Sequence, residues 1–263
     1  MKKSIIAACF LCSFGQLAFA QTYKIKIPNS ADQRVEIELP ATGVLIEGYS
    51  GDEVIIKGPD NLKPIPDRAK GLKPIYYGST DNTGIGLSAE KKGNTLVIQK
   101  AVRQEAAYTI KVPSKVSVKY QQLEFNGGDD VVLKGLEGDV EIKTNQVNIK
   151  AGKISGSFVA NSISGDIEVQ LGQASASKTV AVSTISGDID MTMPAGIKSS
   201  LGMKAIQGEI FTDFDIQRVG GERSGSGLPR VGGGNSLEGT INGGGMAVNL
   251  SVISGNIYLR KAR

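Results

Sequence analysis

The sequence predicts an all-β fold, and within that class a parallel β-helix-like solenoid with rungs of roughly 21 residues. Three observations predict it: a short phrase repeats along the chain, apolar and polar residues alternate within each copy, and no segment sustains a period of 3.6 residues. An antiparallel β-sandwich is the alternative. It has less support, because short turns of the kind that join antiparallel strands are sparse.

The repeated phrase is clearest in the second half of the chain. Ile163-Ser-Gly-Asp-Ile-Glu-Val169 returns as Ile185-Ser-Gly-Asp-Ile-Asp-Met191 and as Ile253-Ser-Gly-Asn-Ile-Tyr-Leu259. Further copies begin at Leu136, Ile154, Ile206 and Leu237. A unit this short cannot bury its apolar face alone, whereas stacked copies can bury one another's, which is the principle of a solenoid.

Each copy reads as a strand, a corner and a second strand. Val180 and Val182 precede the phrase, and the alternation then shifts by one residue just before Ile185. A shift of one residue would turn every later side chain to the other face unless the chain bends there. In this register Ile185 and Gly187 face the core, with glycine allowing the tight bend, and Asp188 faces outward.

Two segments interrupt the repeats within a single predicted domain over residues 21–263. Residues 57–86 are rich in lysine, proline, glycine and asparagine, and a hairpin is predicted at about 87–100, so the whole excursion covers about 57–100. Residues 217–236 are rich in glycine and predict a flexible loop.

Residues 1–20 have the pattern of a signal peptide. Lys2 and Lys3 precede an apolar stretch, and Ala18-Phe-Ala20 is a small-x-small cleavage site. We therefore expect export to the periplasm, the cell surface or the medium, with no transmembrane span in the mature chain. A lipoprotein anchored through Cys9 is a minor alternative, because the apolar run before that cysteine is short.

The composition excludes several kinds of chemistry. The chain has no histidine, and Cys9 and Cys12 both lie in the predicted signal peptide. Imidazole catalysis, thiol catalysis and a disulfide framework are therefore not expected in the mature chain, and no cofactor is expected either. Loss of Lys2 and Lys3 leaves 28 basic residues against 26 acidic ones, and this near-neutral charge argues against a nucleic-acid partner.

The first candidate site is the outward polar residue that follows each corner glycine. Stacked rungs lie about 4.8 Å apart, so these residues would form a column able to bind a divalent cation or sugar hydroxyls. The alternative, which we favour, is that Asp and Asn are simply suitable residues beside a glycine bend. The column comprises Asp139, Asp166, Asp188 and Glu209, with Asn256 as its last member.

The second candidate site is the basic part of the excursion. Its cations and paired tyrosines could bind an anionic glycan or an acidic partner. The alternative, which we favour, is a solvated loop whose prolines limit its flexibility. The residues are Lys63, Arg68, Lys70, Lys73, Tyr76 and Tyr77.

The chain also resembles a known family. The turns Leu39-Pro-Ala-Thr-Gly-Val44 and Met193-Pro-Ala-Gly-Ile197, the Ser-Gly-Asp-Ile repeats and the closing Ser254-Gly-Asn-Ile-Tyr-Leu259 resemble the bacterial putative-adhesin family of β-strand-repeat domains. Arg68–Ile75 and Asp81–Leu87 resemble its Bacteroidetes-type members. The resemblance implies an exported all-β solenoid and supplies no catalytic residues.

Three classes of function follow from these observations. We expect foremost a non-catalytic, adhesin-like interaction protein of the cell envelope or surface, whose partner is an unknown protein or glycan. A carbohydrate-binding or polysaccharide-cleaving solenoid is the second class. A structural component of the envelope is the third.

The signal peptide can be tested by mass spectrometry. We expect the intact mass of the protein from its native host to correspond to a chain that begins at Gln21 without lipid. A mass that fits Cys9 with attached acyl chains would instead establish a lipoprotein.

Overall fold

The computed structural model describes most of the chain after the predicted signal peptide. The described residues are 22–40, 43–59, 66–69, 71–72, 79–124, 128–173, 176–218 and 235–263. Residues 1–20 and Cys9 lie outside them. Within the described part, no helix is long and apolar enough to cross a membrane.

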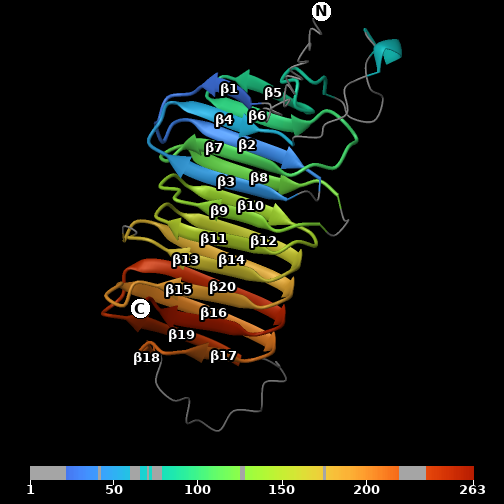
Figure 1. Cartoon of the computed structure of the whole chain (residues 1–263). Coiled ribbons are helices and arrows are strands. Elements are labelled where there is room, and N and C mark those ends of the chain that lie inside the picture. Colours follow the sequence, from blue (N-terminus) through green and yellow to red (C-terminus); the bar gives the residue numbers. More distant parts are fainter. Residues whose placement is uncertain are drawn as a thin grey trace, which may run out of the picture.

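Two large β-sheets face each other (Figure 1). We call them sheet A and sheet B. Sheet A has the spatial order β1 (Thr22–Lys26), β4 (Glu53–Lys57), β7 (Tyr108–Pro113), β3 (Val44–Tyr49), β9 (Val131–Lys134), β11 (Ile149–Ile154), β13 (Ile167–Leu171), β15 (Ile189–Met193), β21 (Ile257–Lys261), β17 (Ile210–Thr212).

Sheet B covers the other side of the core. Starting from the opposite end of the stack, where sheet A ends, its spatial order is β18 (Gln217–Arg218), β19 (Asn235–Ile241), β16 (Ser199–Gln207), β20 (Met246–Ser254), β14 (Thr179–Ser186), β12 (Phe158–Ser164), β10 (Val140–Thr144), β8 (Ser117–Gln122), β2 (Arg34–Leu39), β6 (Thr95–Lys100), β5 (Leu87–Lys92). The described helix is a single 3-10 turn, Asp67–Ala69.

The chain passes back and forth between the sheets, and successive passes stack in parallel. Strands β12 and β14 pair in sheet B with Phe158 opposite Val180, and β13 and β15 pair in sheet A with Ile167 opposite Ile189. The interval is 22 residues in both pairs, whereas Val140 and Phe158, also paired, are 18 apart. The all-β class and the parallel stacking are as the sequence predicts.

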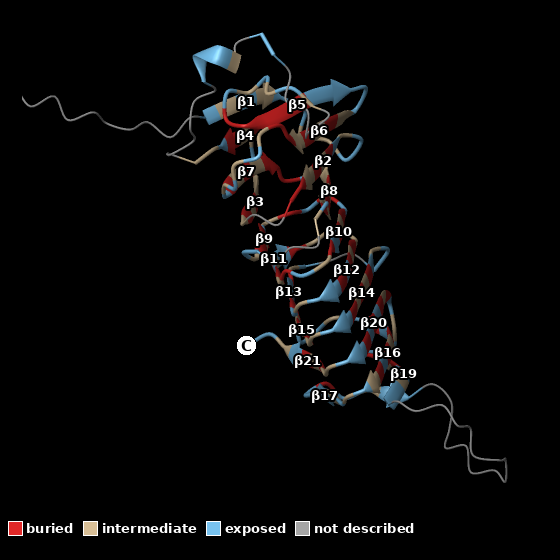
Figure 2. Ribbon diagram, turned by 90° about the vertical axis from the view of Figure 1, so that its right-hand side faces the viewer, coloured by how far each residue is buried: buried red, intermediate tan, exposed pale blue. Residues whose placement is uncertain are grey.

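Apolar residues of both sheets form one buried core cluster. Figure 2 shows buried residues recurring along the strands of both sheets. In β15 the inward residues are Ile189, Met191 and Met193, all fully buried, and in β14 they include Val180 and Val182. This burial stabilises the fold by about 25 cal/mol for each Å² of apolar surface removed from water. Because the core continues from rung to rung, no single rung has a closed core of its own.

The isoleucine that opens the copies at Ile163, Ile185 and Ile253 does not face the core, so the sequence prediction is wrong for these copies, whereas Ile154 is buried. Ile163, Ile185 and Ile253 are 42%, 49% and 42% exposed, whereas Thr184 is buried. The alternation of β14 therefore continues without a shift to Ile185. The phase changes after the isoleucine, where residues 186–188 turn the chain into sheet A.

The corner glycine is required, but not by the core. Gly187 has a φ of 133°, which side chains rarely adopt, and a Cβ there would overlap the carbonyl oxygen of Gly165 in the adjacent rung. The constraint is therefore the close approach of two backbones along the stack. The prediction that Gly187 faces inward is corrected accordingly.

Antiparallel pairs occur at the two ends of the described stack. They are β1 with β4, β4 with β7 and β5 with β6 at one end, and β16 with β19 and β18 with β19 at the other. The β5–β6 pair is the hairpin predicted at about 87–100. Of the predicted loop 217–236, residues 217–218 form β18 and 235–236 begin β19, while 219–234 lie outside the described residues.

The order of rungs in space differs from their order along the chain. The rung formed by β20 and β21 lies between the β14–β15 rung and the β16–β17 rung. At the other end, the rung formed by β2 and β3 lies between the β6–β7 rung and the β8–β9 rung. The β20–β21 rung and the β2–β3 rung are thus both inserted between rungs that are neighbours along the chain.

The corner constraint predicts the effect of a single methyl group. Gly187→Ala should lower the free energy of unfolding by roughly 3 kcal/mol, because it combines an unfavourable φ with backbone overlap. Gly196→Ala is the matched control, since a Cβ at Gly196 would have no atom within 4 Å. Denaturant unfolding of both variants provides the measurement. Equal stabilities would mean that the corner has room for a side chain.

Candidate functional site

A ladder of side-chain to backbone hydrogen bonds runs along the corner between sheets B and A. The Asp188 N–H donates to Asp166 Oδ1 at 2.9 Å, and the Asn256 N–H donates to Asp188 Oδ1 at 2.7 Å. The Glu209 N–H then donates to Asn256 Oδ1 at 2.9 Å. Each side chain thus satisfies the backbone of the next rung. We call this set the corner ladder: Asn148, Asp166, Asp188, Asn256 and Glu209.

The structure brings together Asp166, Asp188, Asn256 and Glu209 of the predicted column, and the order and membership of the column differ from the prediction. Asn256 lies between Asp188 and Glu209, because the β20–β21 rung is inserted there. Asn148 also belongs to the ladder, since it accepts the Asp166 N–H at 2.9 Å. The repeat phrase could not reveal Asn148, which is not preceded by a glycine.

Asp139 does not belong to this column. It precedes β10 and therefore lies where the chain enters sheet B, at the opposite corner. Its Oδ1 accepts the Ser157 N–H at 2.9 Å and lies 2.8 Å from Lys178 Nζ. Burial alone would raise the pKa of Asp139, but the bonds from Lys178 and Ser157 outweigh it and lower the pKa. The phrase Leu136-Glu-Gly-Asp-Val140 resembles the other copies while serving the other corner.

The corner ladder is explained by its hydrogen bonds. Each acceptor in it is an Asp or an Asn, and both offer the oxygen that the next backbone N–H needs. Within the described part of the chain, no group of three or more His, Cys, Asp or Glu residues is arranged to hold a metal ion. The ladder hydrogen bonds join each rung to the next.

Most of the basic candidate site lies outside the described residues. Arg68 is described and is exposed on the 3-10 turn. Lys63, Lys70, Lys73, Tyr76 and Tyr77 fall among the residues that the structure does not describe, so this candidate stays a prediction.

The exposed isoleucines line up on four neighbouring strands of sheet B. Ser164 pairs with Ser186, Ser186 with Ser254, and Gln207 with Ser254. The residue before each of these is an isoleucine, so the four isoleucines also stand side by side, about 4.8 Å apart. We call them the isoleucine ridge: Ile163, Ile185, Ile253 and Ile206. Three are exposed and Ile206 is half-buried.

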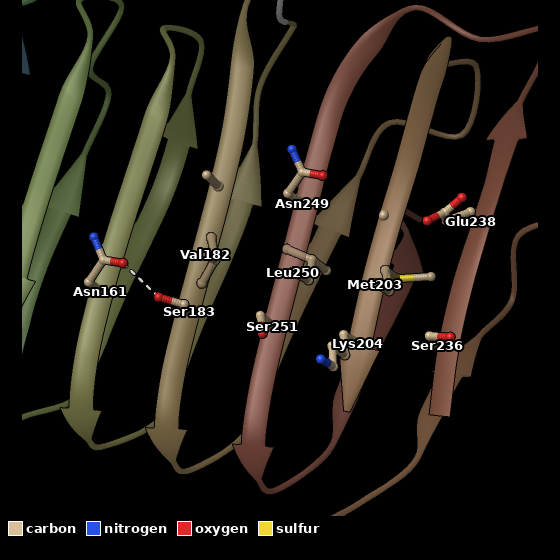
Figure 3. A pocket seen from close by; sticks show the side chains of 12 residues that line it. Asn161, Val182, Ser183, Met203, Lys204, Ser236, Glu238, Asn249, Leu250 and Ser251 are labelled. Atoms are coloured by element: carbon tan, nitrogen blue, oxygen red, sulfur yellow. Dashed lines mark hydrogen bonds between the residues drawn. The ribbon is translucent and has the colours of Figure 1, made fainter. Parts of the chain in front are cut away.

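A shallow hollow lies on the outer face of sheet B next to the ridge (Figure 3). Its volume is about 390 Å³. Gly202 and Ala181, which have little or no side chain, are among its lining residues. On one side Ser183 Oγ donates to Asn161 Oδ1 at 2.6 Å. Lys204 and Glu238 give it one charge of each sign.

One buried cation was not predicted from the sequence. Lys100 is 2% exposed, and its Nζ lies 3.2 Å from the Tyr108 hydroxyl and 4.8 Å from the centre of that ring. Burial lowers the pKa of Lys100 to about 8 and raises that of Tyr108, whose hydroxyl donates to the Ile85 carbonyl. The inward parity of Lys100 in β6 is the signal that could have revealed it.

The family model for Toastrack DUF4097 matches residues 18–207. The chain belongs to the Toastrack DUF4097 family. This confirms the resemblance to adhesin-like β-strand-repeat domains that the repeats indicated.

Solved structures resemble this Toastrack chain in fold at low sequence identity. A putative cell adhesion protein from Clostridium sporogenes has 14% identity and a TM-score of 0.50, over 92% of this chain and 99% of the other. A putative adhesin from Bacteroides fragilis has 13% identity and a TM-score of 0.36, over 92% and 96%. No curated protein sequence matches the chain.

The corner ladder of this Toastrack protein predicts that two substitutions of Asp188 change the free energy of unfolding by different amounts. Asp188→Ala should lower the free energy of unfolding by about 1 kcal/mol, because the Asn256 N–H loses its acceptor. Asp188→Asn should be nearly neutral, since Asn256 already fills the equivalent place in the next rung. Glu168→Ala, an outward residue of β13, is the control. Denaturant unfolding measures all three.

The same residue tests for a cation site. We expect millimolar calcium to leave the melting temperature unchanged, because the ladder carboxylates already accept backbone hydrogen bonds. A calcium-dependent rise that disappears in Asp188→Asn would instead identify a binding site.

Proposed function

We propose that this protein is an exported, non-catalytic interaction protein of the cell envelope or surface that acts in an adhesin-like manner. The isoleucine ridge and the adjoining hollow on sheet B form its contact surface for a protein or glycan. The observation that carries the proposal is the exposure of Ile163, Ile185 and Ile253 at equivalent places in neighbouring rungs.

The stack does not need isoleucine at these positions. Their side chains point away from the core, and Ser164, Ser186 and Ser254, one residue further along, are polar and equally exposed. Apolar side chains gathered on a surface gain free energy when a partner removes them from water. A ridge of neighbouring isoleucines flanked by uncharged serines is therefore suited to contact with another molecule.

Other features support the envelope as the place of action. Residues 1–20 have the pattern of a signal peptide. The structure from Clostridium sporogenes that shares the fold is described as a putative cell adhesion protein. The absence of histidine from the whole sequence supports a binding role over an enzymatic one.

Retention on envelopes tests the proposal. Labelled protein of residues 21–263 would be incubated with envelopes of its source bacterium and sedimented. We expect the triple variant Ile163→Ser, Ile185→Ser, Ile253→Ser to lower retention by about tenfold or more, because each substitution removes apolar contact area. Its melting temperature should stay close to that of the wild type, since the three side chains lie outside the core.

The control replaces apolar residues on the outer face of the other sheet. Leu45 and Val132 are paired on neighbouring strands of sheet A and are partly exposed. Leu45→Ser with Val132→Ser should leave retention unchanged. A folded ridge variant that binds envelopes as well as the wild type would refute the role of the ridge.

A further inference from the structure

Two aromatic rings stack on the outer face of sheet A. Phe211 of β17 is paired with Tyr258 of β21. Their ring centres are 5.3 Å apart and their planes differ by 11°. The rings therefore lie face to face along the direction in which the rungs stack.

One side of this pair is covered. The Arg260 guanidinium lies 5.2 Å from the centre of the Tyr258 ring, and its Nε donates to both carboxylate oxygens of Asp190 at 2.9 and 3.0 Å. Asp190 stands opposite Tyr258 on β15, on the side away from β17. Arg260 thus covers the Tyr258 face that Phe211 leaves free.

The other side of the pair is open. Phe211 is 48% exposed, and β17 is the last strand of sheet A at this end (Figure 1). In the described part of the chain no strand pairs with the far edge of β17. The outer face of the Phe211 ring is therefore available to a ligand.

Polar and cationic groups surround the rings. A hollow of about 570 Å³ is lined by both aromatic residues, by Thr192 and Thr212, and by Asp213. This volume lies within the range of roughly 300–1,000 Å³ that is typical of ligand sites.

Cations outnumber acids among the residues that line the hollow. Arg260, Lys261 and Arg263 line it, and Asp213 is its acidic lining residue. Asp190 neutralises Arg260, and Lys261 Nζ lies 3.7 Å from Asp215. Among the described residues no carboxylate pairs with Arg263, so its guanidinium can pair with an anionic ligand.

We propose that this hollow binds an acidic glycan. The apolar C–H face of a pyranose ring would stack on the open face of Phe211, with Arg263 holding a carboxylate of the sugar. The threonine hydroxyls around the rings suit a ligand rich in hydroxyl groups. This site goes beyond the proposed function and lies on sheet A, apart from the isoleucine ridge.

Calorimetry with uronic acid tetramers tests the inference. The probes are the tetramers of galacturonic acid and of mannuronic acid, each compared with its methyl ester, which keeps the rings and removes the charge. We expect residues 21–263 to bind at least one acid tetramer more tightly than its ester. Phe211→Ala should weaken binding of acid and ester by about tenfold, because the stacking surface is lost.

Two further variants separate charge and stacking from general effects. Arg263→Gln should weaken only the acid form, which then binds like its ester. Leu123→Ala removes an apolar side chain of similar exposure that lies in neither the hollow nor the ridge, and this variant should bind as the wild type does.

Three results would overturn the inference. They are no binding of either tetramer by the wild type at millimolar concentration, equal binding by Phe211→Ala, and no preference of the wild type for acid over ester. None of these three results bears on envelope retention through the ridge. Failure of the glycan proposal can therefore be distinguished from failure of the proposed function.

Discussion

The close approach of successive rungs at the corner is the constraint on which the rest of the structure depends. Gly165, Gly187 and Gly255 have φ values of 138°, 133° and 144°. A Cβ on any of them would overlap a backbone carbonyl of the adjacent rung. Because the rungs are this close, the side chain after the glycine reaches the next backbone N–H, and the corner ladder forms. The glycine and the acid of each repeat are thus two parts of one contact.

The hydrogen bond from a backbone N–H to the side-chain Oδ1 of the adjacent rung recurs along the ladder, which explains how the stack can depart from chain order. Asn256 occupies the place beside Asp188 that an acid of the following rung would occupy, and its N–H donates to Asp188 Oδ1. The β20–β21 rung can therefore lie between two rungs that are neighbours along the chain. Strand β21 of this rung pairs with β15, and the paired residues Ile189 and Ile257 are 68 residues apart in the chain. The β16–β17 rung, which lies between them in the sequence, is therefore on the far side of the β20–β21 rung. In the described part of the chain, antiparallel strands lie at both ends of sheet B and at the β1 end of sheet A, whereas β17 at the other end of sheet A pairs in parallel with β21.

The sequence was sufficient for the fold class but not for the arrangement of rungs. Period-two alternation and the repeated glycine indicate stacked parallel strands, and these are present. Equivalent copies carry no information about which copy lies beside which, so the position of Asn256 was not predictable. Similar phrases occur at both corners, so the phrase around Asp139 could not show which corner that residue occupies. Ile185 was misplaced because an apolar residue was assumed to face inward.

The exposed surfaces follow from the same stacking. Once Thr184 faces the core, Ile185 must face outward, and the equivalent residue of each neighbouring rung stands beside it. A serine or threonine would satisfy the strand at these places, since only the backbone takes part in the pairing. The stack thus turns a single choice of residue, repeated in each copy, into a continuous surface. Phe211 and Tyr258 show this on sheet A, where two rungs suffice to build an aromatic stack. A binding surface on such a fold would therefore be a column of residues at equivalent places in neighbouring strands, rather than a row of successive residues in one strand.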